Sequence, residues 1–308
     1  MASKSKLIVI LGPTASGKTD LSIGLALRLG SGQAKKKFGV NGVEIVSADS
    51  RQVYKGMDIG SGKITKKEMA GIPHYLLDVA NSKTRFSIAQ YQKLALSAIK
   101  KIQDKNKIPF LVGGTGFYIQ SVVDGVVIPE VKPNWKLRKK LEKLTTEQLF
   151  EKLKKIDPKR AEVIDKQNPR RLIRALEIVL KTGQPVPKLE GRAFQFSVLE
   201  IGIKKSPEEL KKSIHKRLLK RLEKNAMINE VRRLHKSLSW KRLEEFGLEY
   251  RFVAQYLQNK ITYQEMIDYT QKESEHLVKK QLTWFKRNKK IHWVKNQKEA
   301  EKLIKNFL

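Results

Sequence analysis

The sequence predicts an α/β protein with a parallel sheet core, a helical insertion and a helical C-terminal part. Through the first 128 residues, short apolar runs rich in β-branched residues alternate with longer segments of helical periodicity. Strands that alternate with helices in this way are typical of a parallel, doubly wound sheet. From Trp135 onward, apolar residues instead recur at the spacing of amphipathic helices.

Three short apolar runs in the first part predict buried strands, at residues 7–11, 44–48 and 108–112. A glycine-rich loop follows the first run and leads into a helix that stops at Gly30. Helical spacing of leucine and isoleucine predicts another helix over residues 87–102. The segment from Ala34 to Gly42 contains three lysines and two glycines, so we expect a surface loop there.

The second part is predicted to be mostly helical, with two further strands at residues 196–203 and 291–294. Apolar spacing predicts helices over residues 135–156, 170–180 and 207–234. Ser206, followed three residues later by Glu209, forms a capping signal for the last of these helices. We therefore expect residues 1–128 to form the first part of the core, residues 129–167 a helical insertion, and residues 168–308 the remaining core with C-terminal helices.

Composition indicates an anionic partner. The chain has 64 Lys and Arg against 31 Asp and Glu, a net charge of +33 that is spread along its whole length. Such an excess favours a polyanion such as nucleic acid, although solvated helix faces are the alternative explanation. The chain contains no cysteine, which excludes disulfides, Cys-ligated zinc and thiol catalysis. No apolar run approaches the ~20 residues of a membrane span, so we expect a cytoplasmic protein without membrane contact.

The glycine-rich loop matches the phosphate-binding pattern GxxxxGKT. Its residues are Gly12, Pro13, Thr14, Ala15, Ser16, Gly17, Lys18 and Thr19. In such a loop, backbone N–H groups face phosphates at a helix N-terminus, the lysine adds charge and the threonine hydroxyl can hold Mg²⁺. The core is therefore predicted to be P-loop NTPase-like, although most such loops bind nucleoside triphosphates and the pattern alone does not identify the reaction.

Asp49 follows the second predicted strand, which would bring it to the carboxyl edge of the sheet, on the same side as the phosphate loop. A carboxylate at that place can bind Mg²⁺, cap the next helix or act as a base. The residues alone leave these three roles open.

The chain resembles the bacterial tRNA dimethylallyltransferases. The resemblance covers nearly the whole chain and rests on six motifs in family order: GPTASGKT at 12–19, SADSRQVYKGMDIGSGK at 47–63, GIPHYLLD at 71–78, LVGGTGFYIQ at 111–120, PRRLIRALE at 169–177 and KKQLTWFKR at 279–287. Two positions depart from the family pattern. Ala226 replaces a usual glycine, and residues 247–250 read GLEY where GYKE is usual. We expect neither departure to touch the chemistry, and we expect the effect of the second, if any, on a tRNA contact or on local packing.

The resemblance implies transfer of a dimethylallyl group from dimethylallyl pyrophosphate to the exocyclic amine of the adenosine on the 3′ side of the tRNA anticodon. It implies that the loop, Thr14 to Thr19 in particular, binds the pyrophosphate instead of splitting ATP, with Mg²⁺ on Thr19. Asp49 would accept the proton from the amine, and Arg217 would contact the pyrophosphate. Asp49, Thr19 and Arg217 are thus the implied catalytic residues.

The resemblance also implies a set of tRNA contacts, with the anticodon stem-loop as partner and a monomeric enzyme. The implied contacts are Asp49, Ser50, Arg51, Gln52, Thr115, Arg138, Arg170, Arg171, Leu172, Ile173 and Arg174. The segment 279–287 interleaves aromatic and basic residues, which suits base stacking with phosphate contact, or equally the buried face of a terminal helix.

Three alternatives share the phosphate loop. A kinase of a nucleotide or small metabolite does not explain the charge or the arginine-rich segment 170–174. A non-catalytic RNA-binding protein does not explain why Asp49 accompanies a complete Gly17-Lys18-Thr19 sequence. Prenylation of free AMP or ATP is disfavoured by the insertion and by the charge.

Overall fold

The computed structural model describes residues 5–129, 131–187 and 196–308. The chain forms two compact units: a larger one from residues 1–124 and 194–308, and a smaller one from residues 125–193. The boundary expected at residue 167 falls inside the smaller unit. Across the described ranges, no helix combines the length and apolarity needed to cross a membrane.

The larger unit is built on a parallel sheet of six strands, which confirms the predicted α/β class. Its spatial order is β3-β2-β4-β1-β5-β6. The strands are β1 (Ser5–Leu11), β2 (Val43–Ala48), β3 (His74–Tyr75), β4 (Ile108–Gly113), β5 (Phe196–Ile203) and β6 (His292–Val294). The central strands are buried on both faces, which is why they are continuous apolar runs instead of alternating ones.

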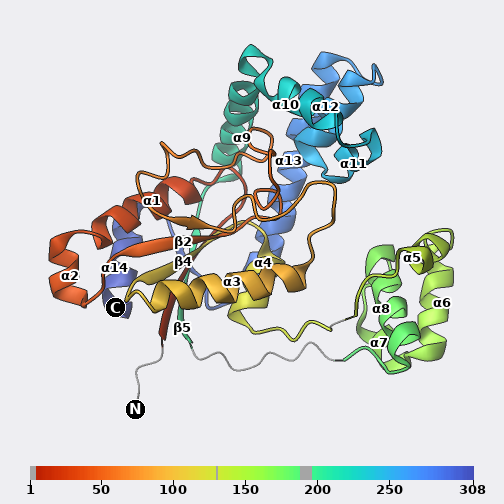
Figure 1. The fold of residues 1–308 in the computed structure, drawn as a ribbon, viewed down its shortest axis with the longest axis horizontal. Coiled ribbons are helices and arrows are strands. Elements are labelled where there is room, and N and C mark those ends of the chain that lie inside the picture. Colours follow the sequence, from red (N-terminus) through yellow and green to blue (C-terminus); the bar gives the residue numbers. More distant parts are fainter. Residues whose placement is uncertain (1–4, 130, 188–195) are drawn as a thin grey trace. The chain divides into compact units, whose positions relative to one another are not determined.

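Helices cover both faces of this sheet (Figure 1). On one face, α1 (Lys18–Leu29) and α14 (Gln297–Phe307) pack against Ile8 and Ile10 of β1. On the other face, α3 (Ile88–Gln103) and α4 (Gly116–Val123) pack against Leu7, Val9 and Leu11 of the same strand. The loop expected between Ala34 and Gly42 was partly wrong, because a short helix, α2 (Gly32–Phe38), covers its first half.

The register brings three loops to one edge of the sheet. Leu11, the last residue of β1, lies opposite Gly113 of β4, and Ala48, the last residue of β2, lies opposite the same glycine. The segments that follow β1, β2 and β4 therefore begin side by side. They carry the phosphate loop, Asp49 and Thr115, respectively.

The C-terminal helices complete the larger unit. They are α9 (Pro207–Leu222), η1 (Glu223–Asn225), α10 (Ala226–His235), α11 (Trp240–Glu245), α12 (Leu248–Leu257) and α13 (Tyr263–Lys286). The single helix expected over residues 207–234 is interrupted, because Lys224 and Asn225 adopt left-handed backbone conformations with φ of 52° and 56°. Two such residues end the helical hydrogen-bond ladder and allow α10 to leave in a new direction.

Among the described residues of the smaller unit, the helices are α5 (Trp135–Leu141), α6 (Thr146–Ile156), α7 (Pro158–Val163) and α8 (Pro169–Thr182). Leu149 and Leu153 of α6 share one apolar core with Leu172 and Leu176 of α8. This shared core explains why α8 belongs to the smaller unit, although the sequence analysis assigned residues 168 onward to the main core.

Candidate functional site

The phosphate loop links β1 to α1 through two left-handed residues, Ala15 (φ 60°) and Gly17 (φ 88°). Gly17 precedes α1 and provides no side-chain cap, so the first N–H groups of the helix are not satisfied by a capping side chain. Free N–H groups and the helix dipole together make this terminus suitable for an anion.

Ser16 lies deep in the loop, with 1% of its surface exposed. Its hydroxyl has no hydrogen-bond partner among the described residues. A Cβ on Gly12 would lie 2.8 Å from this hydroxyl oxygen, so glycine is required for the loop to close over it. A buried hydroxyl without a partner costs about 1–3 kcal/mol, and it is available to an oxygen-rich ligand.

Two cations converge on this edge. Burial lowers the pKa of Lys18 to about 8, an effect that nearby Asp49 opposes and Arg217 strengthens. Burial and the like charge of Arg221 lower the pKa of Arg217, on α9, to about 10. Neither Lys18 nor Arg217 has an ion-pair partner within the described part of the chain, and the Lys18 ammonium donates instead to the carbonyl of Pro13, at 2.9 Å. The site is therefore strongly electropositive.

Asp49 closes the turn after β2. Its Oδ1 accepts hydrogen bonds from the backbone N–H groups of Arg51 (2.8 Å) and Gln52 (3.3 Å). The carboxylate therefore does not cap a helix, one of the three roles that the sequence left open, because the residues after it form a turn. These hydrogen bonds use one oxygen, which leaves Oδ2 available to take a proton or bind a cation.

Thr115 joins the turn after β4 to the Asp49 turn. Its Oγ1 accepts from the backbone N–H of Ser50 at 3.1 Å, and its own N–H donates to the carbonyl of Ala48, also at 3.1 Å. A Cβ on Gly113 would lie 2.2 Å from that Ala48 carbonyl oxygen, so only glycine permits this close approach. Asp49, Ser50 and Thr115 are therefore brought together.

A buried carboxylate that the sequence analysis missed supports the neighbouring loop. Glu230 accepts hydrogen bonds from the backbone N–H groups of Asp58, Ile59 and Gly60, at 2.7–3.0 Å. The Tyr250 hydroxyl donates to the same carboxylate. Burial and the charge of Glu230 raise the pKa of this tyrosine. Nothing in the local sequence distinguishes Glu230 from the solvated glutamates of other helices.

The GLEY segment takes part in local packing beside α9, the kind of effect that was expected of this departure from the family pattern. Glu249 forms an ion pair with Arg221, whose guanidinium also donates to the carbonyl of Gly60. Arg221 is thereby neutralised by a carboxylate, whereas Arg217, one turn earlier on α9, is not. The charge of Glu249 also acts on Arg217, whose pKa it raises against the effect of burial.

The donor set fits a magnesium ion. Thr19 lies exposed in the first turn of α1, beside Asp20, and Asp49 presents an uncommitted oxygen at the same edge. Among the described residues no three His, Cys, Asp or Glu side chains cluster as a metal site. Mg²⁺ bound to phosphates needs only one or two protein oxygens, which these residues provide.

The predicted tRNA contacts of the larger unit lie around the same edge. Ser50, Arg51 and Gln52 are half-buried in the turn after Asp49. The Nε of Arg51 donates to the carbonyl of Phe246 at 2.6 Å, and the Gln52 amide donates to the carbonyl of Gly62 at 3.1 Å. The fold thus orients these side chains beside Asp49.

The predicted contacts of the smaller unit divide into two kinds. Arg138 forms a bidentate pair with buried Glu177, at 2.8 and 2.6 Å, and Arg174 binds the same carboxylate. Arg170 and Arg171 are exposed at the start of α8. Leu172 and Ile173 require a correction: they are 0% and 8% exposed and belong to the apolar core, so their side chains do not reach RNA.

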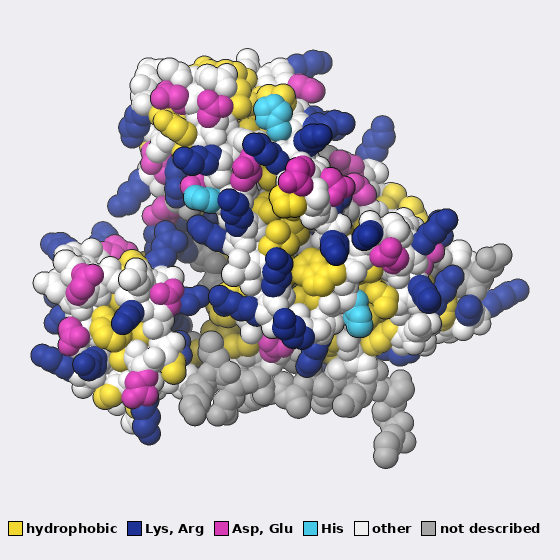
Figure 2. Space-filling model, turned by 180° about the vertical axis from the view of Figure 1, so that it is seen from behind, with side chains coloured by type: hydrophobic (Ala, Val, Ile, Leu, Met, Phe, Trp, Pro, Cys, Tyr) yellow, Lys and Arg dark blue, Asp and Glu magenta, His cyan; other side chains and the backbone are white. Residues whose placement is uncertain are grey.

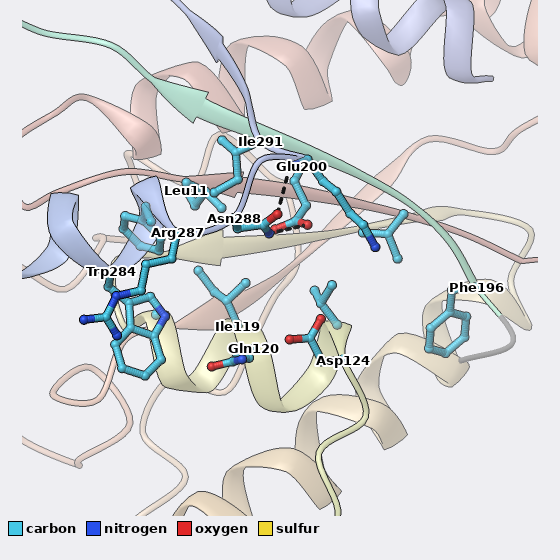
Figure 3. A pocket seen from close by; sticks show the side chains of 15 residues that line it. Leu11, Ile119, Gln120, Asp124, Phe196, Glu200, Trp284, Arg287, Asn288 and Ile291 are labelled. Carbon is cyan, nitrogen blue, oxygen red and sulfur yellow. Dashed lines mark hydrogen bonds between the residues drawn. The ribbon is translucent and has the colours of Figure 1, made fainter. Parts of the chain in front are cut away.

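The segment 279–287 lies on the last turns of α13, where one aromatic residue is buried, as the terminal-helix interpretation requires, and the basic residues face outward. Phe285 is buried in the core, whereas Lys279, Lys280, Lys286 and Arg287 are exposed. Trp284 lines a cavity of about 600 Å³. Gln120, Glu200 and Arg287 line the same cavity (Figure 3). Glu200 accepts a hydrogen bond from Asn288 at 2.8 Å, and burial raises its pKa.

Lys and Arg side chains are distributed over the visible face of each unit, with Asp and Glu interspersed (Figure 2). The charge excess is thus carried by folded surface. This distribution is compatible with contact to an extended polyanion.

Comparison with known proteins identifies the family. A family model described as IPP transferase matches residues 52–288. A tRNA dimethylallyltransferase of Halothermothrix orenii is 38% identical over 321 residues, covering 99% of this chain and 94% of the relative. One from Anoxybacillus flavithermus is 39% identical over 293 residues, covering 94% and 89%.

Solved structures agree. The full-length tRNA isopentenylpyrophosphate transferase of Bacillus halodurans matches with a TM-score of 0.70 and 35% identity, over 99% of this chain and 95% of that one. A eukaryotic dimethylallyltransferase acting on tRNA matches with a TM-score of 0.71 and 26% identity, over 91% and 70%. With its core fold, its phosphate loop and these matches over nearly its whole length, the chain belongs to the IPP transferase family.

Proposed function

We propose that this chain transfers a dimethylallyl group from dimethylallyl pyrophosphate to the exocyclic amine of the adenosine 3′-adjacent to the anticodon in tRNA, releasing pyrophosphate. One observation carries the proposal: the Asp49 carboxylate lies at the sheet edge near two cations, Lys18 and Arg217, that form no ion pair with any residue the structure describes. A proton acceptor next to an anion-binding loop suits a reaction that removes a proton and releases pyrophosphate. Membership of the IPP transferase family supports it.

On the donor side, the loop N–H groups, Lys18 and Arg217 bind the pyrophosphate and stabilise the negative charge that grows on it as it leaves. Thr19 would hold Mg²⁺, which when bound neutralises further pyrophosphate charge. The carbon–oxygen bond breaks readily because the allylic carbon delocalises its positive charge. No covalent enzyme intermediate is needed.

On the acceptor side, an adenine amine is a poor nucleophile because its lone pair is delocalised into the ring. As the new carbon–nitrogen bond forms, Oδ2 of Asp49 takes the amine proton, and the electron pair of the breaking carbon–oxygen bond leaves with pyrophosphate. Ser50, Gln52 and Thr115, at the same edge, orient the base for this step.

The target base must leave its stack to reach Asp49, which is easiest in a single-stranded loop such as the anticodon loop. The exposed arginines Arg170 and Arg171 and the basic outer face of α13 then contact the anticodon stem-loop backbone. All of the residues in these roles come from one chain, and we propose that the active species is a monomer. A tRNA substrate implies a cytoplasmic reaction.

The test is an assay of which label moves. The protein is incubated with bulk tRNA, Mg²⁺ and dimethylallyl pyrophosphate labelled in the prenyl group, and in parallel with γ-labelled ATP and candidate acceptors. The proposal predicts prenyl label in tRNA, recovered after nuclease digestion as a prenylated adenosine. Movement of the γ-phosphate would instead identify a P-loop kinase, and tRNA binding with no label transfer would identify a non-catalytic RNA-binding protein.

A further inference from the structure

Gln281, on the inner side of α13, connects two of the loops that meet at the sheet edge. Its Oε1 accepts a hydrogen bond from the backbone N–H of Thr14 at 2.9 Å. Its Nε2 donates to the backbone carbonyl of Gly114 at 2.8 Å. Thr14 belongs to the phosphate loop, and Gly114 immediately precedes Thr115. A single side chain therefore fixes the spacing between these loops.

Gly114 is packed so closely that its surroundings leave no space for a side chain. A Cβ at this position would lie 2.7 Å from Gln281 Nε2, 3.2 Å from the carbonyl oxygen of Gly12 and 3.5 Å from the Lys18 ammonium. The amide of Gln281, the start of the phosphate loop and the lysine therefore all converge on one glycine. Because this region is closely packed, a displacement of the Gln281 side chain would also shift the start of the phosphate loop and Lys18.

The next turn of α13 holds the same segment from a second point. A Cβ on Gly116 would lie 2.3 Å from the indole of Trp284, so the ring packs directly against the backbone of the turn. Trp284 also makes an edge contact with Phe117, with ring centroids 6.2 Å apart, and lies at one end of the cavity in Figure 3. The helix thus clamps residues 114–116 through two side chains three residues apart.

The clamp extends to Asp49. Thr115 accepts a hydrogen bond from Ser50 and donates one to Ala48, the residues on either side of Asp49. A continuous chain of contacts therefore runs from the phosphate loop, through Gln281 and Thr115, to the turn that carries the proposed base. The separation of its two ends sets the distance between the pyrophosphate and the proton acceptor.

We propose that Gln281 is a positioning residue for prenyl transfer, which sets the phosphate loop at its working distance from Asp49. This inference rests on the proposed function. Gln281 acts through Thr14 and Gly114, and an amide is required because one side of the contact needs an acceptor and the other a donor. A glutamate would lack the donor and would bring negative charge close to Lys18.

The experiment compares Gln281→Met with the wild type. Methionine keeps the length and packing of the side chain but removes both hydrogen bonds. We expect the single-turnover rate of prenyl transfer to fall by about 10–10²-fold, the effect of a misplacement of roughly 1 Å. The KM for tRNA, the Kd for inorganic pyrophosphate and the melting temperature should stay close to the wild-type values.

The matched control is Gln264→Met on the same helix. Gln264 is exposed, and its amide hydrogen-bonds only locally, to Asp268 at 3.0 Å. Its substitution should leave every one of these quantities unchanged. If Gln281→Met loses melting temperature and pyrophosphate binding in proportion to rate, the glutamine is merely structural and the proposal is overturned.

A double-mutant cycle with Thr115→Val, which keeps the shape and removes the hydroxyl, tests the route through Thr115. The proposal is supported if the fold-loss of single-turnover rate in the double variant is smaller than the product of the two single fold-losses. A fold-loss equal to that product would overturn it. A Gln281→Met rate within twofold of an active wild type would overturn only the positioning role. An inactive wild type would overturn the proposed function and this inference with it.

Discussion

The basic residues of the two units differ in what surrounds them. In the smaller unit, Arg138 and Arg174 both bind Glu177, a carboxylate whose side chain is 0% exposed. At the edge of the sheet, Lys18 and Arg217 are just as enclosed by protein but have no ion-pair partner in the described ranges. A cation with a buried carboxylate partner serves the fold, and one without such a partner is available to a ligand.

The pKa shifts express the same difference. Burial lowers the pKa values of Lys18 and Arg217, because the loss of solvation outweighs the attraction of nearby carboxylates such as Asp49. Burial also opposes the charge of Glu177, but hydrogen bonds from Arg138, Asn134 and Arg174 outweigh it and bring the pKa below its usual value. The cations of the site are thus preorganised for an anionic ligand, whereas Arg138 and Arg174 of the smaller unit already pair with Glu177.

The largest effect is expected at the site. Asp49→Asn keeps the shape and the turn-closing hydrogen bonds of the side chain but removes its basicity. If Asp49 takes the amine proton, the single-turnover rate should fall by ~10²–10⁴, while binding of tRNA and pyrophosphate changes little. Single-turnover transfer is measured together with the two binding constants.

A magnesium titration of the same variant separates the two roles of Asp49. Recovery of most of the rate in excess Mg²⁺ would indicate that the carboxylate is a metal ligand. A rate close to wild type at ordinary Mg²⁺ would eliminate both roles.

The second effect concerns stability and lies in the other unit. Arg138→Met removes one of the partners of buried Glu177 while Arg174 remains. Removing one partner of a buried ion pair costs about 3–5 kcal/mol of stability. Because Arg138 is partly exposed and Arg174 still binds Glu177, we expect the free energy of unfolding to fall by about 2–3 kcal/mol. Hydrogen exchange should increase within residues 131–187 and not in the sheet. Unchanged exchange there, with weaker tRNA binding, would make Arg138 a direct RNA contact.

The sheet could be predicted from sequence because its strands are local apolar runs and its site loops follow them directly. Gly12 to Thr19 forms the loop after β1, and Asp49 follows β2, so a parallel arrangement alone brings them to one edge. The interruption of α9 at Lys224 and Asn225 could not be predicted. Asn225 tolerates the left-handed conformation, but Lys224 does not favour it, and the local sequence contains no glycine or proline that would mark the break.

The partners of charged residues were equally invisible in the sequence. Arg138 and Glu177 are 39 positions apart, and Glu230 meets Gly60 across 170 positions. Sequence patterns report residue type and local spacing, which is why Arg138, Leu172 and Arg171 could stand together as implied tRNA contacts. Only the fold distinguishes a core leucine and a paired arginine from an exposed one.

The affinity of the phosphate loop for pyrophosphate should depend on pH through Lys18. Because the pKa of this lysine is about 8 in the free protein, the ammonium loses its proton as the pH rises through 8. Bound pyrophosphate favours the protonated form, so the affinity for inorganic pyrophosphate should decline above pH 8 by up to about tenfold per pH unit. Lys18→Arg keeps its charge and should show a flatter profile in calorimetric titrations. Identical profiles for both proteins would mean that another group controls binding.

The smallest effect is expected on tRNA affinity, for the exposed arginines of α8. They complement the test of Arg138, because they have no buried carboxylate partner among the described residues. Arg170→Gln removes a charge without a buried partner, so melting temperature and hydrogen exchange should not change. If Arg170 contacts a tRNA phosphate, affinity should weaken a few-fold at physiological salt, and the slope of log K against log salt should lose about 0.7–0.9. Lys101→Gln, at an exposed position of α3, is the matched control and should alter neither quantity. Equal slopes for Arg170→Gln and wild type would show that exposure of an arginine is not sufficient for RNA contact. The lack of a carboxylate partner would then account for ligand binding by the cations at the phosphate loop, but not by those of the smaller unit.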